Sequence, residues 1–295
     1  MAVIFAVDLG GTHVKSAIID KQCQLYEKDK TKTPDSLEDL TSYIREKVRR
    51  YAAYEIEGIA ISSPGAVTEA GVILGASAIP YIHGPNIKEH FEKEISLPVQ
   101  IENDANCSAL AELWKGEAEG KKNVAVVVIG TGVGGALIKD GSIHKGIHLH
   151  AGEFGYMILN PANLGSGQNT FSELASTSSI IRRAAAYKNV DRSTLTGEKV
   201  FQLAEAGDEA CIRAIDEFYH MLAIGLYNIQ YAYDPELILI GGGISNREDI
   251  LKGIDEKLAK VVKQIKIATV TPEVDRCQFS SDANLIGAVY HYLYQ

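Results

Sequence analysis

One pattern occurs twice in this chain: an apolar strand-like run, a glycine-rich turn and a second strand-like run. In the first half, residues 3–7 are apolar, the turn contains Gly10-Gly11-Thr12, and residues 13–20 return as a strand. In the second half, residues 124–129 are apolar and lead into the glycine-rich turn at 130–135. Apolar runs bounded by glycines predict β-hairpins. Two such hairpins predict an internally duplicated α/β fold.

Length, charge and cysteine usage narrow the class of protein. The chain has 295 residues, enough for two domains of ordinary size, and a formal net charge of -9. Its basic residues form no stripe, which argues against a nucleic-acid partner. No apolar stretch approaches the roughly 20 residues that span a bilayer, and the N-terminus carries no signal pattern. The four cysteines are dispersed. We therefore expect a cytoplasmic protein with reduced cysteines and no membrane partner.

Asp104 lies where a predicted strand ends and a predicted helix begins. It belongs to the run Glu102-Asn103-Asp104-Ala105-Asn106, which follows the apolar residues 97–101 and precedes apolar residues at helical spacing. A carboxylate here can cap the helix by accepting hydrogen bonds from its first N–H groups. It can also act as a general base, because α/β sheets collect ligands at the carboxyl ends of their strands. The position alone favours the cap, and the two roles are compatible.

The glycine-rich turn at 130–135 formally matches the dinucleotide pattern G-x-G-x-x-G, with Glu153 further on. That pattern needs a helix that begins at the glycines. Here residues 136–138 read as a strand, and Asp140-Gly141 indicates another tight hairpin. A nicotinamide site is therefore disfavoured, and no Walker-type motif is present.

Backbone N–H groups of glycine turns form concavities that bind anions, since no Cβ blocks close approach. Each of the two turns carries a Thr after its strand, which favours phosphate binding over an ordinary hairpin. Lys15 adds positive charge, and Asp8 is a candidate to hold Mg²⁺ through water. The glycines that follow the apolar residues 237–240 suit close approach to an adenine or ribose. Lys15, Gly134, Gly242 and Gly243 are therefore candidate residues for nucleotide binding.

Five motifs in order resemble the ROK sugar kinases, relatives of hexokinase, actin and the heat-shock ATPases. The motifs are Asp8-Leu9-Gly10-Gly11-Thr12, residues 102–106, residues 130–135, Ala151-Gly152-Glu153-Phe154-Gly155 and Ile240-Gly241-Gly242-Gly243. The resemblance implies two α/β domains of ribonuclease-H type around a central cleft. It implies a small, sugar-side domain at 1–115 plus 283–295 and a large, ATP-side domain at 116–282. It also implies a homodimer.

The same resemblance implies roles for individual residues. Asp104 corresponds to the base that accepts the proton of the sugar 6-hydroxyl. Asn103 corresponds to a residue that binds ring hydroxyls, Gly65 to a loop whose backbone meets the sugar, and Glu153 to the carboxylate on the hydroxyls near C1 and C2. The phosphate-binding turns correspond to Asp8, Gly10, Gly11, Thr12, Gly130, Thr131 and Gly132. ATP with Mg²⁺ is the implied phosphoryl donor.

Tyr156 departs from the family pattern, which usually has His at this position followed by a cysteine-rich zinc segment. Residues 157–175 contain no cysteine, so we expect no structural zinc, which requires about four nitrogen or sulfur ligands. Tyr156 either fills the volume left by the metal site or stacks on the group attached to C1 of the sugar. Residues 160–200 are polar and show no readable periodicity.

Within the family, residues 151–157 and 285–291 resemble the bacterial β-glucoside kinases. The resemblance implies phosphorylation of the 6-hydroxyl of glucose in cellobiose and related β-glucosides. The alternatives are a glucokinase or an N-acetylmannosamine kinase. A sugar-sensing regulator is disfavoured because Asp8 leaves no room for a preceding helix-turn-helix domain. A chaperone-like ATPase that uses no sugar is a further rival.

Overall fold

A computed structural model describes residues 2–295 of the chain. The chain forms two compact units. The first comprises Met1–Gly120, Lys145–Ala151 and Ser281–Gln295, and the second comprises Lys121–His144 and Gly152–Ser280. The segment Lys145–Ala151 therefore belongs to the first unit although both its chain neighbours belong to the second. The domain bounds expected from the sequence remain a prediction.

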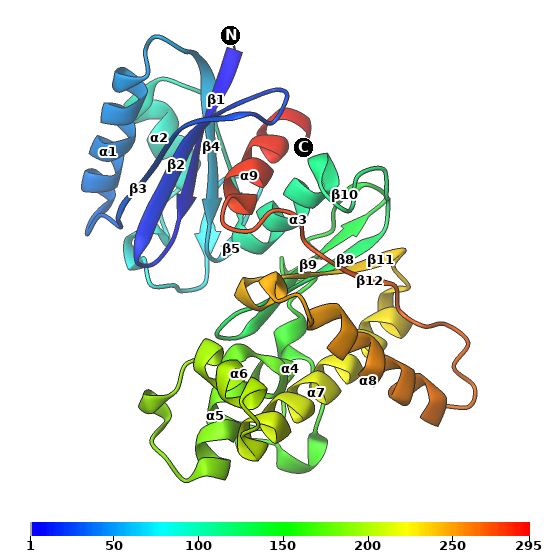
Figure 1. The fold of residues 1–295 in the computed structure, drawn as a ribbon. Helices are drawn as coiled ribbons and strands as arrows, with labels where there is room; N and C mark the ends of the chain where they lie inside the picture. The colour runs from blue at the N-terminus through cyan, green and yellow to red at the C-terminus, as the bar shows by residue number, and fades with distance from the viewer. Residues whose placement is uncertain (1) are drawn as a thin grey trace. The chain divides into compact units, whose positions relative to one another are not determined.

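The first unit is built on a mixed five-stranded sheet in the order β3-β2-β1-β4-β7 (Figure 1). The strands are β1 (Ala2–Leu9), β2 (His13–Asp20), β3 (Leu25–Lys32), β4 (Glu55–Ser63) and β7 (Val99–Asn103). β1 pairs antiparallel with β2 and parallel with β4, which pairs parallel with β7. The hairpin predicted around the first glycine turn is therefore confirmed.

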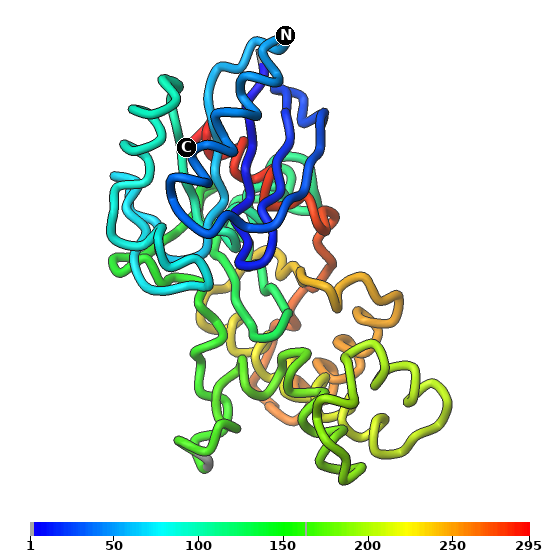
Figure 2. Tube along the Cα trace, turned by 90° about the vertical axis from the view of Figure 1, so that its left-hand side faces the viewer, coloured from blue at the N-terminus to red at the C-terminus, as the bar shows by residue number. Residues whose placement is uncertain are grey.

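Helices cover both faces of this sheet. Helices α1 (Leu37–Arg50) and α2 (Ile87–Ile95) bury Leu40, Ile44 and Phe91 against alternate residues of β1. Helices α3 (Asp104–Lys115) and α9 (Ala283–Tyr294) pack together, and α9 contacts β1, β4 and β7. Figures 1 and 2 both show the C-terminal helix α9 beside the N-terminal strands. The short strands β5 (Ala66–Val67) and β6 (Ile73–Leu74) and a 3₁₀ helix (Pro80–Ile82) lie between β4 and α2 in sequence.

The second unit repeats the sheet topology. Its strand order is β10-β9-β8-β11-β12, with the same sequence of antiparallel and parallel pairs. The strands are β8 (Val124–Ile129), β9 (Val133–Lys139), β10 (Ser142–Ile143), β11 (Leu237–Gly241) and β12 (Val274–Arg276). Asp140 and Gly141 form the predicted tight turn, both with positive φ (54° and 81°). The two sheets thus share one topology, as the duplicated pattern predicts.

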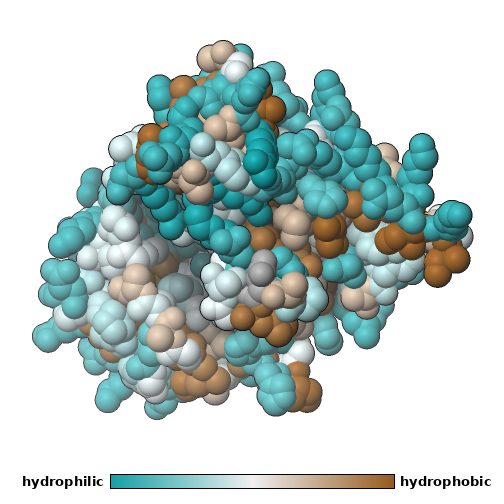
Figure 3. Space-filling view, turned by 90° about the horizontal axis from the view of Figure 1, so that it is seen from below, coloured by the Kyte–Doolittle hydropathy of each residue, from teal (hydrophilic) through white to brown (hydrophobic). Residues whose placement is uncertain are grey.

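The helices of the second unit share a core centred on the 25-residue helix α7 (Glu209–Tyr233). The others are α4 (Phe171–Ala175), α5 (Thr177–Lys188), α6 (Gly197–Glu205) and α8 (Ile250–Gln264), with 3₁₀ helices at Phe154–Tyr156, Pro161–Asn163, Arg192–Thr194 and Gly243–Asn246. No helix within residues 2–295 has the length and apolar character to cross a bilayer. The face in Figure 3 is mostly hydrophilic, with hydrophobic side chains in small groups.

Candidate active site

In the first unit, Asp8 lies at the carboxyl end of β1 and is 6% exposed. Strand register places it between Lys15 of β2 and Ser62 of β4. Its Oδ1 accepts hydrogen bonds from Ser62 Oγ (3.1 Å) and Asn284 Nδ2 of α9 (3.0 Å). Lys15 Nζ lies 3.5 Å from Asp8 Oδ2 and donates to the carbonyl of Ser281 (3.0 Å). These contacts hold the carboxylate in one orientation.

The first glycine turn is closed by its own backbone and by Thr33, which sequence reasoning missed. Gly10 N donates to His13 O (3.1 Å), and Thr33 Oγ1 donates to Gly10 O (2.5 Å). Thr33 N donates to Thr12 O (3.1 Å). A Cβ at Gly11 would lie 2.6 Å from the Cβ of Ala78, so the turn needs glycine there.

Asp104 is the first residue of α3 and is half-exposed. The N-cap is Asn103 and not Asp104, although Asp104 Oδ1 also accepts a hydrogen bond from Ala105 N (2.8 Å), one of the first N–H groups of the helix. Asn103 Oδ1 accepts from Ala105 N (2.9 Å) and Asn106 N (3.2 Å). Asn103 Nδ2 donates to Gly65 O (3.0 Å), and Gly65 has φ +99°, a conformation that favours glycine. The structure therefore brings Gly65, Asn103 and Asp104 together.

In the second unit, the turn at Gly130–Gly132 borders a cavity of about 520 Å³, a size typical of ligand sites. Gly130 N donates to Gly132 O (2.9 Å), and Thr177 N donates to Gly130 O (3.0 Å), which ties the start of α5 to the turn. The positive end of the α5 dipole therefore faces the same turn. The lining residues are Ile129, Gly130, Thr131, Thr177, Ser178, Ile181, Gly197, Glu198, Phe201, Gly243, Ile244 and Arg247.

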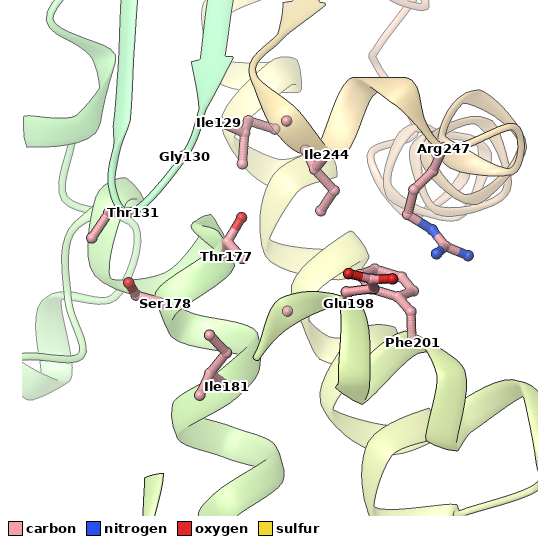
Figure 4. Close-up of a pocket in the computed structure, with 12 residues that line it drawn as sticks. Ile129, Gly130, Thr131, Thr177, Ser178, Ile181, Glu198, Phe201, Ile244 and Arg247 are labelled. Atoms are coloured by element: carbon pink, nitrogen blue, oxygen red, sulfur yellow. The ribbon is translucent and has the colours of Figure 1, made fainter. Parts of the chain in front are cut away.

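Arg247 and Phe201 form one wall of this cavity (Figure 4). The guanidinium carbon lies 3.8 Å from the centre of the Phe201 ring. Two hydrogen bonds to Asp249 (2.8 and 2.9 Å) and one to Glu205 (3.1 Å) fix the guanidinium. The bonds to Asp249 raise the pKa of Arg247 above its usual value. Figure 4 shows the α5 residues on the opposite side of the cavity, so a flat ring could lie between the two walls.

The glycines predicted for the nucleotide side differ in their surroundings. A Cβ added at Gly130 or Gly243 meets no atom within 4 Å, although both residues line the cavity. A side chain there would occupy space now open to a ligand. Gly134 is also open, whereas Gly242 has φ +87° and a Cβ there would lie 2.2 Å from Ile129 O. Gly242 is thus required by the local backbone.

In the segment 151–156, Glu153 and Tyr156 are exposed because the residues between and beside them pack inward. A Cβ at Gly152 would lie 2.7 Å from Ala136 Cα, and one at Gly155 would lie 2.1 Å from Val133 O, so both glycines press against β9. Phe154 is buried between them. Glu153 and Tyr156 therefore point outward, and Tyr156 is 73% exposed. A ring this exposed fills no interior volume, so the volume-filling alternative is wrong.

Much of the cavity wall was missed by sequence reasoning. Glu198 comes from the polar stretch at 160–200, Phe201 directly follows that stretch, and Arg247 follows the 3₁₀ helix at Gly243–Asn246. Glu, Phe and Arg are common residue types, and these three positions carry no recognisable motif. One sequence signal could have located this wall. Thr196 is a typical N-cap residue, and it caps α6 by accepting a hydrogen bond from Lys199 N (3.1 Å), so it indicates that a helix begins within residues 160–200.

Comparison with known proteins gives near-complete matches. The ROK family matches residues 4–294. A curated protein of Klebsiella pneumoniae named beta-glucoside kinase is 35% identical, covering 98% of this chain and 95% of its own. A ROK family protein from Streptococcus pneumoniae, solved with sucrose, is 39% identical with a TM-score of 0.91, covering 99% and 98%. A ROK family glucokinase from Streptomyces griseus, solved with glucose and AMPPNP, is 25% identical with a TM-score of 0.78, covering 97% of each chain.

Proposed function

This chain belongs to the ROK family, as its motifs predict, and we propose that it is an ATP-dependent kinase of β-glucosides. Solved ROK family structures share the fold of this chain, so the fold predicted from the resemblance is also confirmed. The proposed reaction transfers the γ-phosphoryl group of ATP to the 6-hydroxyl of the glucose unit in substrates such as cellobiose, giving 6-phospho-β-glucosides. The observation that carries it is the half-exposed Asp104 at the carboxyl end of β7, beside neighbours that the protein itself holds in place.

On the sugar side, Asp104 is the proposed general base. Its carboxylate orients the 6-hydroxyl and accepts the proton as the oxygen bonds to the γ-phosphorus. Asn103 and the Gly65 backbone are proposed to bind ring hydroxyls, and Glu153 to bind those near C1 and C2. The exposed Tyr156 is proposed to stack on the group at C1.

On the ATP side, the backbone N–H groups of the turns at Gly10–Thr12 and Gly130–Gly132 are proposed to hold phosphate oxygens. The cavity beside Gly130 suits the adenine, with Gly243 and Arg247 as neighbours. Asp8 fits a magnesium site, because Mg²⁺ takes few protein oxygens together with phosphate and water oxygens. When bound, Mg²⁺ neutralises charge on the phosphates. Among residues 2–295, no group of three or more His, Cys, Asp or Glu side chains is arranged to hold a metal.

The alternatives within the family are a glucokinase and an N-acetylmannosamine kinase. We further propose a cytoplasmic homodimer. The relatives named above support the sugar kinase class, and the β-glucoside kinase supports the disaccharide substrate.

A sugar panel tests the proposed substrate. Purified protein with ATP and Mg²⁺ is assayed by coupled ADP release on cellobiose, gentiobiose, glucose and N-acetylmannosamine, with a no-sugar blank. We expect the highest kcat/KM on a disaccharide and a 6-phosphate product by mass spectrometry and NMR. Poor turnover of both disaccharides together with rapid turnover of a monosaccharide would contradict the β-glucoside assignment and make that monosaccharide the substrate. Equal ATP hydrolysis in the blank would instead favour a sugar-independent ATPase.

Substitution of Arg247 by Ala tests the assignment of the cavity to the nucleotide. Loss of the guanidinium removes part of the cavity wall and frees the Phe201 ring, so we expect KM for ATP to rise by about fivefold, which corresponds to about 1 kcal/mol of lost binding. KM for the sugar should stay within about twofold of the parent value. The matched control is Arg213→Ala, which removes a guanidinium 4.2 Å from the Tyr187 ring, outside the cavity. Equal effects of the two substitutions would contradict the assignment.

A further inference from the structure

A buried carboxylate, Glu102, lies directly behind the proposed catalytic corner of the first unit. It is 1% exposed and is the residue before Asn103 at the end of β7. Its Oε1 accepts hydrogen bonds from Asn103 N (2.7 Å) and Asn106 Nδ2 (3.0 Å). Oε1 of Glu102 therefore binds the backbone N–H of Asn103, which precedes Asp104, and the side chain of Asn106, which follows it.

The other oxygen of Glu102 faces Lys145, whose Nζ lies 2.6 Å from Oε2. Lys145 begins the segment Lys145–Ala151, which joins the first unit while its chain neighbours belong to the second. Most of this segment is exposed, and its ends are joined by a hydrogen bond from Ala151 N to Lys145 O (3.0 Å). The Lys145 side chain is only 22% exposed, because it reaches inward to Glu102.

His291 of α9 also faces Glu102, with Nδ1 3.8 Å from Oε2. Burial lowers the pKa of this imidazole, although the charge of Glu102 opposes the shift. The lowered pKa favours the uncharged ring at neutral pH, and Nδ1 lies farther from Oε2 (3.8 Å) than Lys145 Nζ does (2.6 Å). Compensation of the buried carboxylate falls to the ammonium of Lys145, and a buried carboxylate without a cation is costly.

We propose that Lys145 is a positioning residue for phosphoryl transfer: its ion pair with Glu102 holds the Asn103–Asp104 corner in the geometry that the sugar hydroxyl requires. The inference rests on the proposed function. Asn103 caps α3 and holds Gly65, so displacement of Glu102 reaches three residues of the sugar side. A reacting group that is misplaced by about 1 Å can cost roughly a hundredfold in rate.

Three variants test this inference. Lys145→Met keeps the length of the side chain but removes its charge, and we expect kcat for the sugar to fall by roughly tenfold to a hundredfold. KM for ATP should change by less than about twofold. Lys145→Arg keeps the charge and should retain most of the activity. In Glu102→Gln with Lys145→Met, no charge remains unpaired, so part of the lost kcat should return.

The matched control is Lys139→Met, which removes the charge of an exposed lysine on β9. Amide hydrogen exchange of peptides that cover residues 102–107 gives a readout that needs no kinase activity. Faster exchange in Lys145→Met, reversed in the double variant, supports the inference even if the sugar panel rejects the substrate. Parent-like kcat and exchange in Lys145→Met would overturn it. A loss of activity in Lys145→Met that is fully accounted for by a lower Tm, and that Lys145→Arg does not rescue, would also overturn it.

Discussion

Substitution of Asp104 by Asn is expected to lower kcat by roughly 10²- to 10⁴-fold, the range for loss of a general base. The amide has the shape of the carboxylate but does not accept the proton of the 6-hydroxyl. Sugar binding by titration calorimetry should stay within a few-fold of the parent, because Asn103 and Gly65 retain their contacts. Steady-state kinetics on the best sugar of the panel measures the loss.

The fold should tolerate this change, because Asn103 and not Asp104 caps α3. A Tm within about 2 °C of the parent would show this. Asp35→Asn, which changes an exposed aspartate at the surface, is the matched control and should keep parent activity. Near-parent kcat in Asp104→Asn would remove Asp104 from the role of base, whatever sugar is used.

The hairpins and their turns could be predicted from the sequence because their signals are local. Apolar runs and glycines occupy adjacent positions, so periodicity and turn chemistry suffice. The cap at α3 shows the limit of local signals. Asn103 and Asp104 are both good cap residues, and pairing of Ser63 with Asn103 decides between them, because it extends β7 to Asn103.

The nucleotide cavity could be predicted only on its glycine side. Gly130 and Gly243 stand in recognisable turns, whereas Phe201 and Arg247 belong to different elements that meet through packing on the shared core. The pair of Glu102 and Lys145 was missed for the same reason. No sequence motif links Glu102 to Lys145. The two residues meet because the segment Lys145–Ala151 packs with the first unit, although its chain neighbours belong to the second.

Substitution of Gly287 by Ala is expected to destabilise the first unit by about 2 kcal/mol or more. Helix propensity alone would favour Ala by about 1 kcal/mol. The new Cβ, however, would lie 1.7 Å from Cys107 O and 2.4 Å from Cys107 C, where α9 crosses α3. These are backbone atoms that cannot rotate away, so the helices must separate, and overpacking typically costs about 1–3 kcal/mol and occasionally more. Urea unfolding with an unchanged m-value measures the loss.

The same substitution should also lower kcat, because both helices carry proposed site residues. α3 begins at Asp104, and α9 carries Asn284, which donates to Asp8. Gly58→Ala in β4 is the matched comparison, since its Cβ would overlap the Tyr292 hydroxyl at 2.2 Å, a side-chain end that can swing outward. We expect a smaller loss there, removed by a second substitution, Tyr292→Leu. A Gly287→Ala protein as stable as the parent would show that the α3–α9 contact has room for a methyl group.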